Sequence, residues 1–211
     1  MHVGHEENVK KAKEEFGSVF ECDDEGEMKE FVGGKIDIDR KEQSMKITQP
    51  VLLRSFKDEF ELPKRKTPTP LPEGKVFRKA TAEEMIGKRQ QKMFRSAVGK
   101  LLHSRWSRLM ELNAIREVSR HCLEASQEVF DGALCIIKHM VDTPNHGWLL
   151  KPKRSWDGKD KSFKFRIGGK ADSTYASCSN TKRSTSDGSV FLEGAPVVCL
   201  SQGQKNVSLS V

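Results

Sequence analysis

Asp23 and Asp24 form the one Asp-Asp pair in this 211-residue chain. Carboxylates of this kind can hold two Mg²⁺ ions about 4 Å apart, the arrangement that supports phosphoryl transfer. A catalytic pair needs a tight turn between strands to fix it in place. Here the pair lies in the acidic run at residues 21–25, directly after a segment with helical periodicity. The sequence therefore favours a solvated helix exit over a metal centre at this point.

Cysteine and histidine supply a second set of candidate metal ligands. His121 and Cys122 are adjacent, and Cys135 and His139 are four residues apart, on one face if the segment is helical. Structural zinc sites use closely spaced pairs such as Cys-x-x-Cys, and the sequence has none. Cys122 and Cys135 also fit apolar helix faces, so we expect them to pack in the interior rather than bind zinc.

Basic residues carry the third candidate chemistry, the binding of phosphates. The net charge of +7 and the pI near 9.1 favour a polyanionic partner. The candidate nucleic-acid contacts are Arg95, Lys100, Arg105, Arg108, Lys182 and Arg183. Trp106 lies among the first four. Such side chains would neutralise phosphates without reading bases, so binding should weaken with salt. The alternative is that these residues only cover solvated helix faces.

The first half of the chain must position these residues with a mixture of helix and strand. Apolar residues recur at helical spacing over residues 8–20 and again from Leu52 to Phe60. Residues 31–48 alternate as a hairpin with a polar turn at 40–43. Four prolines then punctuate LPKRKTPTPLPEGK, and proline at this density cannot continue a helix. We interpret that stretch as an ordered strap or a linker between subdomains.

The second half changes from helices to strands near Trp148. Three apolar helix faces are expected between residues 82 and 141: Phe94, Val98, Leu101 and Leu102; Ile115, Val118 and Cys122; and Val129, Phe130, Ala133, Ile136, Ile137 and Met140. Beyond Trp148, alternation at 163–167, an apolar run at 190–192, a turn at Gly194 and a run at 196–200 predict strands. The expected fold class is mixed α/β (α+β).

Cellular context is indicated by composition. Hydrophobic residues make up 36% and charged residues 32% of the chain, and no apolar run approaches the roughly 20 residues that cross a bilayer. The first residues carry no apolar signal segment. The five cysteines are odd in number and scattered, which argues against a disulfide framework. We therefore expect an intracellular protein of the cytoplasm or nucleus, not secreted and without a membrane partner.

Six strings occur in an order that resembles a known polyprotein. They are GEMKEFVGGKIDID, MKITQPVLLRSF, KTPTPLPEG, FRSAVGKLLHSRWSR, KADSTYASCSNTKRSTSDGSVFLEGAPV and QKNVSLSV. Together they resemble copia-type retrotransposons, from just after the catalytic turn of the reverse transcriptase into the ribonuclease H domain. The chain departs from the family pattern at Leu109, where proline is usual, and at Cys199, where tryptophan is usual. It also departs at Lys170, where an aromatic or apolar residue is common, and at Asp187-Gly188, where glycine and an aromatic residue are usual.

The resemblance implies a role for each segment. Residues 1–72 would be the end of the palm and the thumb, 73–147 a helical connection, and 148–211 a truncated ribonuclease H-like sheet with an uncovered apolar face. Phe31, Val32 and Gly33 resemble the hairpin that grips the primer terminus. Asp172 matches the first metal-binding acid of ribonuclease H.

The resemblance also implies a function. In the family, Mg²⁺ is the cofactor and an RNA/DNA duplex is the partner. This chain carries Asp172 without the other acids, and a single carboxylate cannot organise two Mg²⁺ ions. We therefore expect a fragment of an RNA-directed DNA polymerase/ribonuclease H that binds no Mg²⁺ and is inactive, with residual affinity for nucleic acid. The alternative is a nucleic-acid-binding or interaction module that the host has reused without enzymatic activity.

Overall fold

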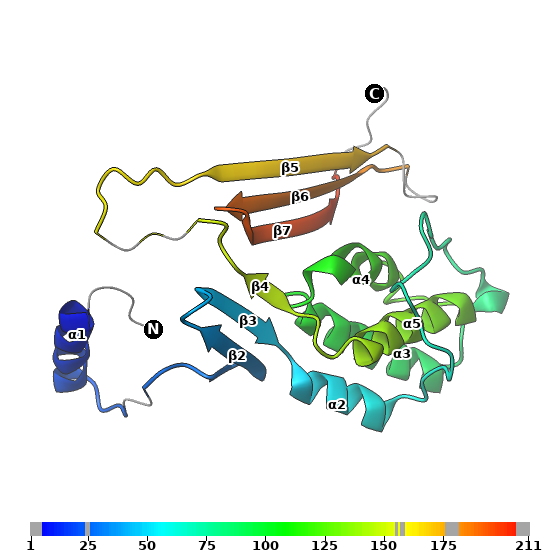
Figure 1. The fold of residues 1–211 in the computed structure, drawn as a ribbon. Helices are drawn as coiled ribbons and strands as arrows, with labels where there is room; N and C mark the ends of the chain where they lie inside the picture. Colours follow the sequence, from blue (N-terminus) through cyan, green and yellow to red (C-terminus); the bar gives the residue numbers. More distant parts are fainter. Residues whose placement is uncertain (1–5, 24–25, 155, 157–158, 176–181, 206–211) are drawn as a thin grey trace.

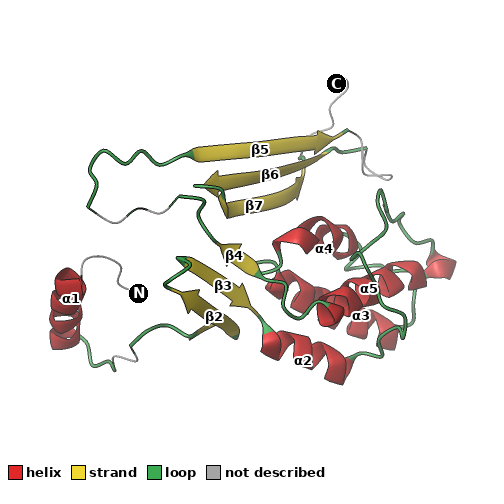
Figure 2. Cartoon of the chain, viewed as in Figure 1, coloured by secondary structure: helices red, strands yellow, loops and turns green. Residues whose placement is uncertain are grey.

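A computed structural model describes residues 6–23, 26–154, 156, 159–175 and 182–205. The chain forms a helical core with one antiparallel sheet beside it and a second antiparallel sheet beyond (Figure 1). Figure 2 shows α2 to α5 gathered together, with α1 (Glu6–Val19) standing apart from them. This arrangement confirms the predicted α+β class.

The first sheet has four strands in the order β1-β2-β3-β4, each antiparallel to its neighbour. Its strands are β1 (Glu30–Phe31), β2 (Gly34–Asp39), β3 (Ser44–Thr48) and β4 (Trp148–Leu150). The predicted hairpin is therefore confirmed, with its polar turn at residues 40–43. Sequence reasoning did not predict that β4 joins this sheet. Gly147 permits the pairing, because a Cβ there would lie 2.2 Å from the carbonyl oxygen of Ile47.

The helical core contains one helix from before the proline-rich segment and three from after it. The elements are α2 (Pro50–Glu59), η1 (Ala82–Glu84), α3 (Lys88–Ser104), η2 (Leu109–Glu111), α4 (Leu112–Ser119) and α5 (Gln127–Asp142). Their buried side chains include Phe56, Phe94, Val98, Leu101, Ile115, Val118, Ile136, Ile137 and Met140. The predicted ranges 1–72 and 73–147 thus share one core.

The proline-rich segment belongs to a strap (residues 61–80) that crosses the helices. Thr67 N donates to Asp142 Oδ2 at 3.3 Å, near the end of α5. Phe77 N donates to the buried carboxylate of Glu117 at 3.1 Å, and the Phe77 ring is 1% exposed in the core. These carboxylates accept hydrogen bonds from backbone N–H groups of the strap, which has no helix or strand to pair them. The interpretation as an ordered strap is confirmed.

The second sheet is a three-stranded meander in the order β5-β6-β7. It comprises β5 (Ile167–Thr174), β6 (Thr185–Leu192) and β7 (Ala195–Gly203), and β6 turns into β7 through Glu193 and Gly194, both at positive φ. Side-chain hydrogen bonds from Trp148 and Arg116 are among those that tie it to the rest of the chain. Trp148 Nε1 donates to Pro196 O at 2.7 Å, and Arg116 Nε donates to Ser201 Oγ at 3.2 Å.

One face of the second sheet remains apolar and exposed. Its residues are Ile167, Val190, Leu192, Val198 and Leu200. They share a face because Ile167 pairs with Leu192, and Val190 with Val198, across adjacent strands. An uncovered apolar face was expected for this part of the chain, and the described residues have it.

Three details differ from the sequence expectations. Phe163 and Phe165 precede β5 and pack with Trp156, with ring centroids 5.0 Å apart between the two phenylalanines and 5.6 Å between Trp156 and Phe165. Their alternation therefore reflects an aromatic cluster rather than a strand. Leu102 is 42% exposed instead of facing the core. The apolar face of α1 is also left open, since Phe16 is 46% exposed.

The turn between β1 and β2 is strained at Val32. Phe31 pairs with Gly34, so Val32 and Gly33 form a two-residue loop, with φ values of 48° and 74°. A β-branched residue in the left-handed region costs about 1–2 kcal/mol, whereas Asn-Gly is the favoured sequence for such a turn. We expect Val32→Asn to raise the free energy of unfolding by about 1 kcal/mol in urea denaturation.

The matched control for that substitution is Val51→Asn, which changes an equally exposed valine within α2. The control should be neutral or slightly destabilising, because asparagine favours turns and is no better than valine inside a helix. Equal effects of the two substitutions would contradict the strain at Val32.

Candidate nucleic-acid interface

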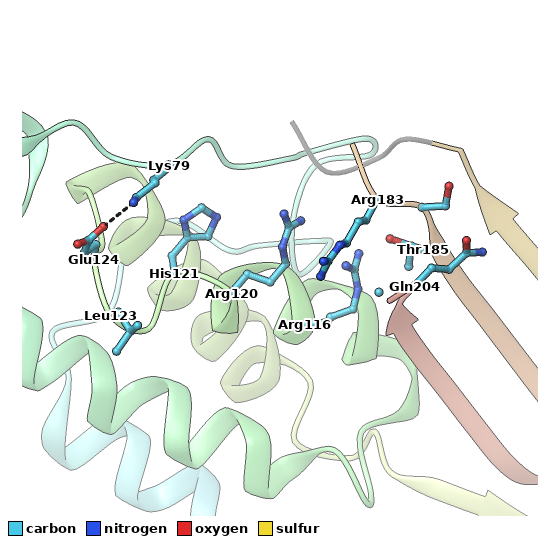
Figure 3. A pocket seen from close by; sticks show the side chains of 11 residues that line it. Lys79, Arg116, Arg120, His121, Leu123, Glu124, Arg183, Thr185 and Gln204 are labelled. Carbon is cyan, nitrogen blue, oxygen red and sulfur yellow. Dashed lines mark ion pairs between the residues drawn. The ribbon is translucent and has the colours of Figure 1, made fainter. Parts of the chain in front are cut away.

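A basic pocket opens between α4 and the near end of the second sheet. Its volume is about 530 Å³. The residues that line it are Lys79, Arg116, Arg120, His121, Leu123, Glu124, Arg183, Ser184, Thr185, Gly203 and Gln204. Figure 3 shows the guanidinium groups of Arg116, Arg120 and Arg183 turned toward the same space. Segments far apart in the sequence therefore converge on one surface.

Glu117 holds Arg116 of α4 and Arg120, the residue that follows α4, in place. Its carboxylate is 5% exposed and lies 2.9 Å from Arg120 Nη1 and 3.6 Å from Arg116 Nη2. Arg116 also donates to Asn113 Oδ1 at 2.7 Å and to Ser201 Oγ. These contacts reduce the number of rotamers that the two arginines can adopt. A phosphate that meets them would therefore encounter donors that are already oriented.

The pocket keeps an excess of positive charge. Lys79 pairs with Glu124 at 3.1 Å, and Arg183 lines the cavity together with Arg116 and Arg120. Burial lowers the pKa of His121, an effect that Glu117 opposes and that Arg120 reinforces. His121 is therefore neutral at pH 7 and adds no charge. Among the residues that line the pocket, four are Lys or Arg and one, Glu124, is acidic, so an anion is the favoured occupant.

The predicted basic residues do not form one cluster. Arg95 is exposed on α3 and donates to the carbonyl of Cys122 at 3.2 Å. Lys100 donates to Ser55 Oγ at 3.1 Å and pairs with Glu59. Arg105 is half-buried, and its Nε has no hydrogen-bond partner among the described residues. Lys182 is exposed at a φ of 55°, and only its neighbour Arg183 lines the pocket.

Arg108 is buried and serves the interior of the fold. It is 3% exposed, and Nη2 donates to the carbonyl oxygens of Met140 and Thr143 at 3.1 and 2.9 Å. Burial lowers its pKa, and Glu111 opposes that effect. The guanidinium group completes the C-terminal end of α5, where helical carbonyls lack partners. Arg108 therefore does not belong to the basic surface for which the sequence made it a candidate.

The hairpin residues Phe31, Val32 and Gly33 lie at an exposed turn, with Phe31 and Val32 56% and 60% exposed. The next residue, Gly34, packs on Trp106, because a Cβ there would be 2.1 Å from the indole ring. Trp106 is thus partly covered by the hairpin rather than open to a base. The Asp24 half of the Asp-Asp pair lies outside the described residues, and Asp23 is exposed.

Asp172 has an acidic neighbour that sequence reasoning missed. It lies directly opposite Asp187 in the β5–β6 pairing, so both side chains are on one face of the sheet. Asp172 is exposed, and Asp187 Oδ1 is buried without a hydrogen-bond partner among the described residues. Two carboxylates do not fit a centre for two Mg²⁺ ions, which needs several converging oxygens. The described residues group no third acid with them.

The structure does not bring together the cysteines and histidines that the sequence offered as zinc ligands. Cys122 is half-buried against the core. Cys135 is half-buried on α5, and burial raises the pKa of its thiol, with Asp131 adding to that effect. His139, from the same helix face as Cys135, instead approaches Glu111 and His146. Among the described residues, this is the one cluster of three metal-binding side chains.

Sequence reasoning missed Lys79, Arg116 and Arg120 as members of the interface. A signal was present, because Arg116 and Arg120 are four residues apart and must share a helix face. Nothing in the sequence indicated that Arg183 would meet them. No family model, curated protein or solved structure matches the chain. Within the described residues, no helix has both the length and the apolar character needed to cross a bilayer.

Proposed function

We propose that this chain binds the sugar-phosphate backbone of a nucleic-acid duplex through its basic pocket. In this proposal it is part of the reverse transcriptase and ribonuclease H region of a copia-type element and has no metal-dependent catalysis of its own. The observation that carries the proposal is the convergence of Arg116, Arg120 and Arg183 on one cavity. Three guanidinium groups repel one another, and a bound phosphate diester would relieve that repulsion through charge-assisted hydrogen bonds.

The membership in the family is supported by the order of the six sequence strings and by the way the architecture accommodates them. The string at residues 170–197 begins within β5, spans β6 and enters β7, and the string at 94–108 spans most of α3 and the turn after it. These two strings therefore coincide with elements and connections of the described residues.

The absence of catalysis is proposed from the acids that the fold brings together. Asp172 and Asp187 are two neighbouring carboxylates on one face of the second sheet. A two-metal reaction needs more oxygen ligands than this pair offers. With Mg²⁺ and an RNA–DNA hybrid, we expect the purified chain neither to extend a primer nor to cleave the RNA strand. Turnover that co-purifies with the chain would contradict the proposal, and its loss in Asp172→Asn would assign that activity to the second sheet.

The binding proposal is tested by fluorescence anisotropy with a labelled RNA–DNA hybrid. The double variant Arg120→Ala/Arg183→Ala is expected to weaken binding by at least about tenfold, because two phosphate contacts are lost. The control is Lys41→Ala/Lys64→Ala, which removes the same net charge from exposed sites outside the pocket. It should change affinity only slightly. Equal weakening by the two double variants would reject the pocket as the binding site.

A second candidate function is a protein interaction module without nucleic-acid binding. The exposed apolar face of the second sheet favours it, since such a face is typical of surfaces that pack against a partner. A thermal melt and the anisotropy measurement together distinguish the two candidate functions. A chain that melts cooperatively but leaves the anisotropy of the hybrid unchanged would support the interaction module.

A further inference from the structure

Three side chains with metal-binding atoms meet where the helical core joins the first sheet. Glu111 ends η2, His139 lies in the last turn of α5, and His146 lies in the loop that leads to β4. One ligand atom from each lies within 4.8 Å of the other two. The imidazole rings of His139 and His146 have centroids 6.4 Å apart. This cluster lies outside the basic pocket and has no part in the proposed binding of phosphates.

The hydrogen bond of His139 fixes which ring nitrogen is available. Nδ1 lies 2.9 Å from the carbonyl oxygen of Thr67 in the strap. A carbonyl oxygen can only accept, so Nδ1 must carry the proton, and Nε2 keeps its lone pair in the neutral ring. Nε2 lies 3.8 Å from Glu111 Oε1. A backbone carbonyl that orients a histidine in this way is the usual second partner of a metal-binding imidazole.

Glu111 provides an independent indication of a missing partner. The residue is 2% exposed, and Oε1 has no hydrogen-bond partner among the described residues. Arg108 Nη1 forms an ion pair with Oε1 at 3.5 Å, which is longer than a good hydrogen bond, because the guanidinium group donates to Thr143 and Met140. The buried oxygen therefore keeps lone pairs that no hydrogen-bond donor occupies, and it can still accept a closer cation.

We propose that Glu111, His139 and His146 form a binding site for a divalent transition-metal ion, with Zn²⁺ as its representative. Two imidazole nitrogens and one carboxylate oxygen are a zinc ligand set, and water would complete a tetrahedron. Mg²⁺ prefers oxygen ligands and is disfavoured here. In a tetrahedral zinc site the ligand atoms are about 3.4 Å apart. The present atoms must therefore move closer, which the exposed loop of His146 permits.

The ion can reach this site from solvent. Glu111 and His146 line a cleft of about 650 Å³ between the α5–β4 loop and the second sheet. Arg108 lies beside the cluster and opposes a dication, so we expect weaker binding than in zinc sites with thiolate ligands. A bound ion would link η2, α5 and the α5–β4 loop, and the strap would be held through Thr67 and His139.

Titration of the full chain with Zn²⁺ by isothermal calorimetry, and with Co²⁺ by visible absorption, tests the site. Outer partners of metal ligands already change affinity 10–100-fold, so we expect His146→Ala to weaken Zn²⁺ binding by at least about 100-fold. His146 is exposed, and its loss should leave the metal-free melt unchanged. His103→Ala, an exposed histidine on α3, is the matched control and should bind Zn²⁺ normally.

The Co²⁺ spectrum should show a four-coordinate ion without thiolate charge-transfer bands. Zn²⁺ at about 100 times its dissociation constant should also raise the melting temperature of the wild type but not of His146→Ala. Normal Zn²⁺ affinity in His146→Ala would overturn the proposal. Loss of binding in Cys135→Ala, or in His2→Ala/His5→Ala, would assign the ion to other residues and would overturn it as well.

Discussion

Phe77→Ala is expected to lower the free energy of unfolding by about 3–5 kcal/mol, because it removes a fully buried aromatic ring. Phe77 lies in the strap and is 1% exposed. Its ring fits against Gly132 of α5, where a Cβ would come within 2.5 Å of Cζ, and it meets His121 edge to face at 6.1 Å. The strap has no regular secondary structure around this ring, so the loss also releases the segment that Phe77 anchors.

Guanidinium denaturation monitored by circular dichroism measures the effect. Val76→Ala is the control, since Val76 is the preceding residue of the strap and is 39% exposed. It should cost much less than Phe77→Ala, because little of its side chain leaves water on folding. A loss for Phe77→Ala that is no larger than for Val76→Ala would show that the strap does not belong to the core.

Glu117→Gln is expected to destabilise the fold by about 3 kcal/mol, because it neutralises a buried charge between two arginines. Glu117 is 4% exposed, accepts from Phe77 N at 3.1 Å and pairs with Arg116 and Arg120. The two arginine side chains are 15% and 25% exposed, so water screens the loss in part. For this reason we expect the lower end of the range for a broken buried pair.

Glu124→Gln serves as the comparison for Glu117→Gln. Glu124 pairs with Lys79, and both side chains are largely exposed. Exposed ion pairs contribute between 0 and about 1 kcal/mol, so this substitution should have a small effect in the same denaturation experiment. Similar losses for the two glutamine substitutions would contradict the structural role assigned to Glu117.

The helical core was largely predictable from sequence, because its apolar residues repeat at helical spacing. The predicted face of α5 from Val129 to Met140 is buried as expected, and so are Phe94, Val98 and Leu101 of α3. Leu102 was wrongly included, since a residue next to the centre of a helix face can point either to the core or to solvent. The β6–β7 hairpin followed from the apolar runs and the turn at Gly194, whereas β5 begins only at Ile167, where the predicted strand was expected to end.

Long-range pairing was not predictable from these patterns. β4 is three residues long and pairs with β3 about 100 residues earlier, which no local periodicity reveals. The aromatic cluster of Trp156, Phe163 and Phe165 imitates strand alternation without forming a ladder. Whether an alternating segment forms a strand or an aromatic cluster depends on tertiary packing rather than on the local sequence.

The candidate sites depended even more on tertiary structure. Arg108 and Arg183 looked equivalent in the sequence, but one completes the end of α5 and the other lines the basic pocket. Asp187 meets Asp172 only through the register of β5 and β6. Glu111 and His146 are 35 positions apart, and the three residues match no known spacing of metal ligands. Sequence reasoning therefore paired His139 with Cys135 instead.

The central claim, that the basic pocket binds phosphates, is tested most directly by the salt dependence of duplex binding. Each neutralised phosphate of B-DNA contributes about 0.9 to the slope of log K against log salt concentration. With a short DNA duplex, the slope for Arg120→Ala/Arg183→Ala should therefore be shallower than that of the wild type by about 1.8. Identical slopes for the two proteins would contradict the account, because the pocket would then neutralise no phosphate.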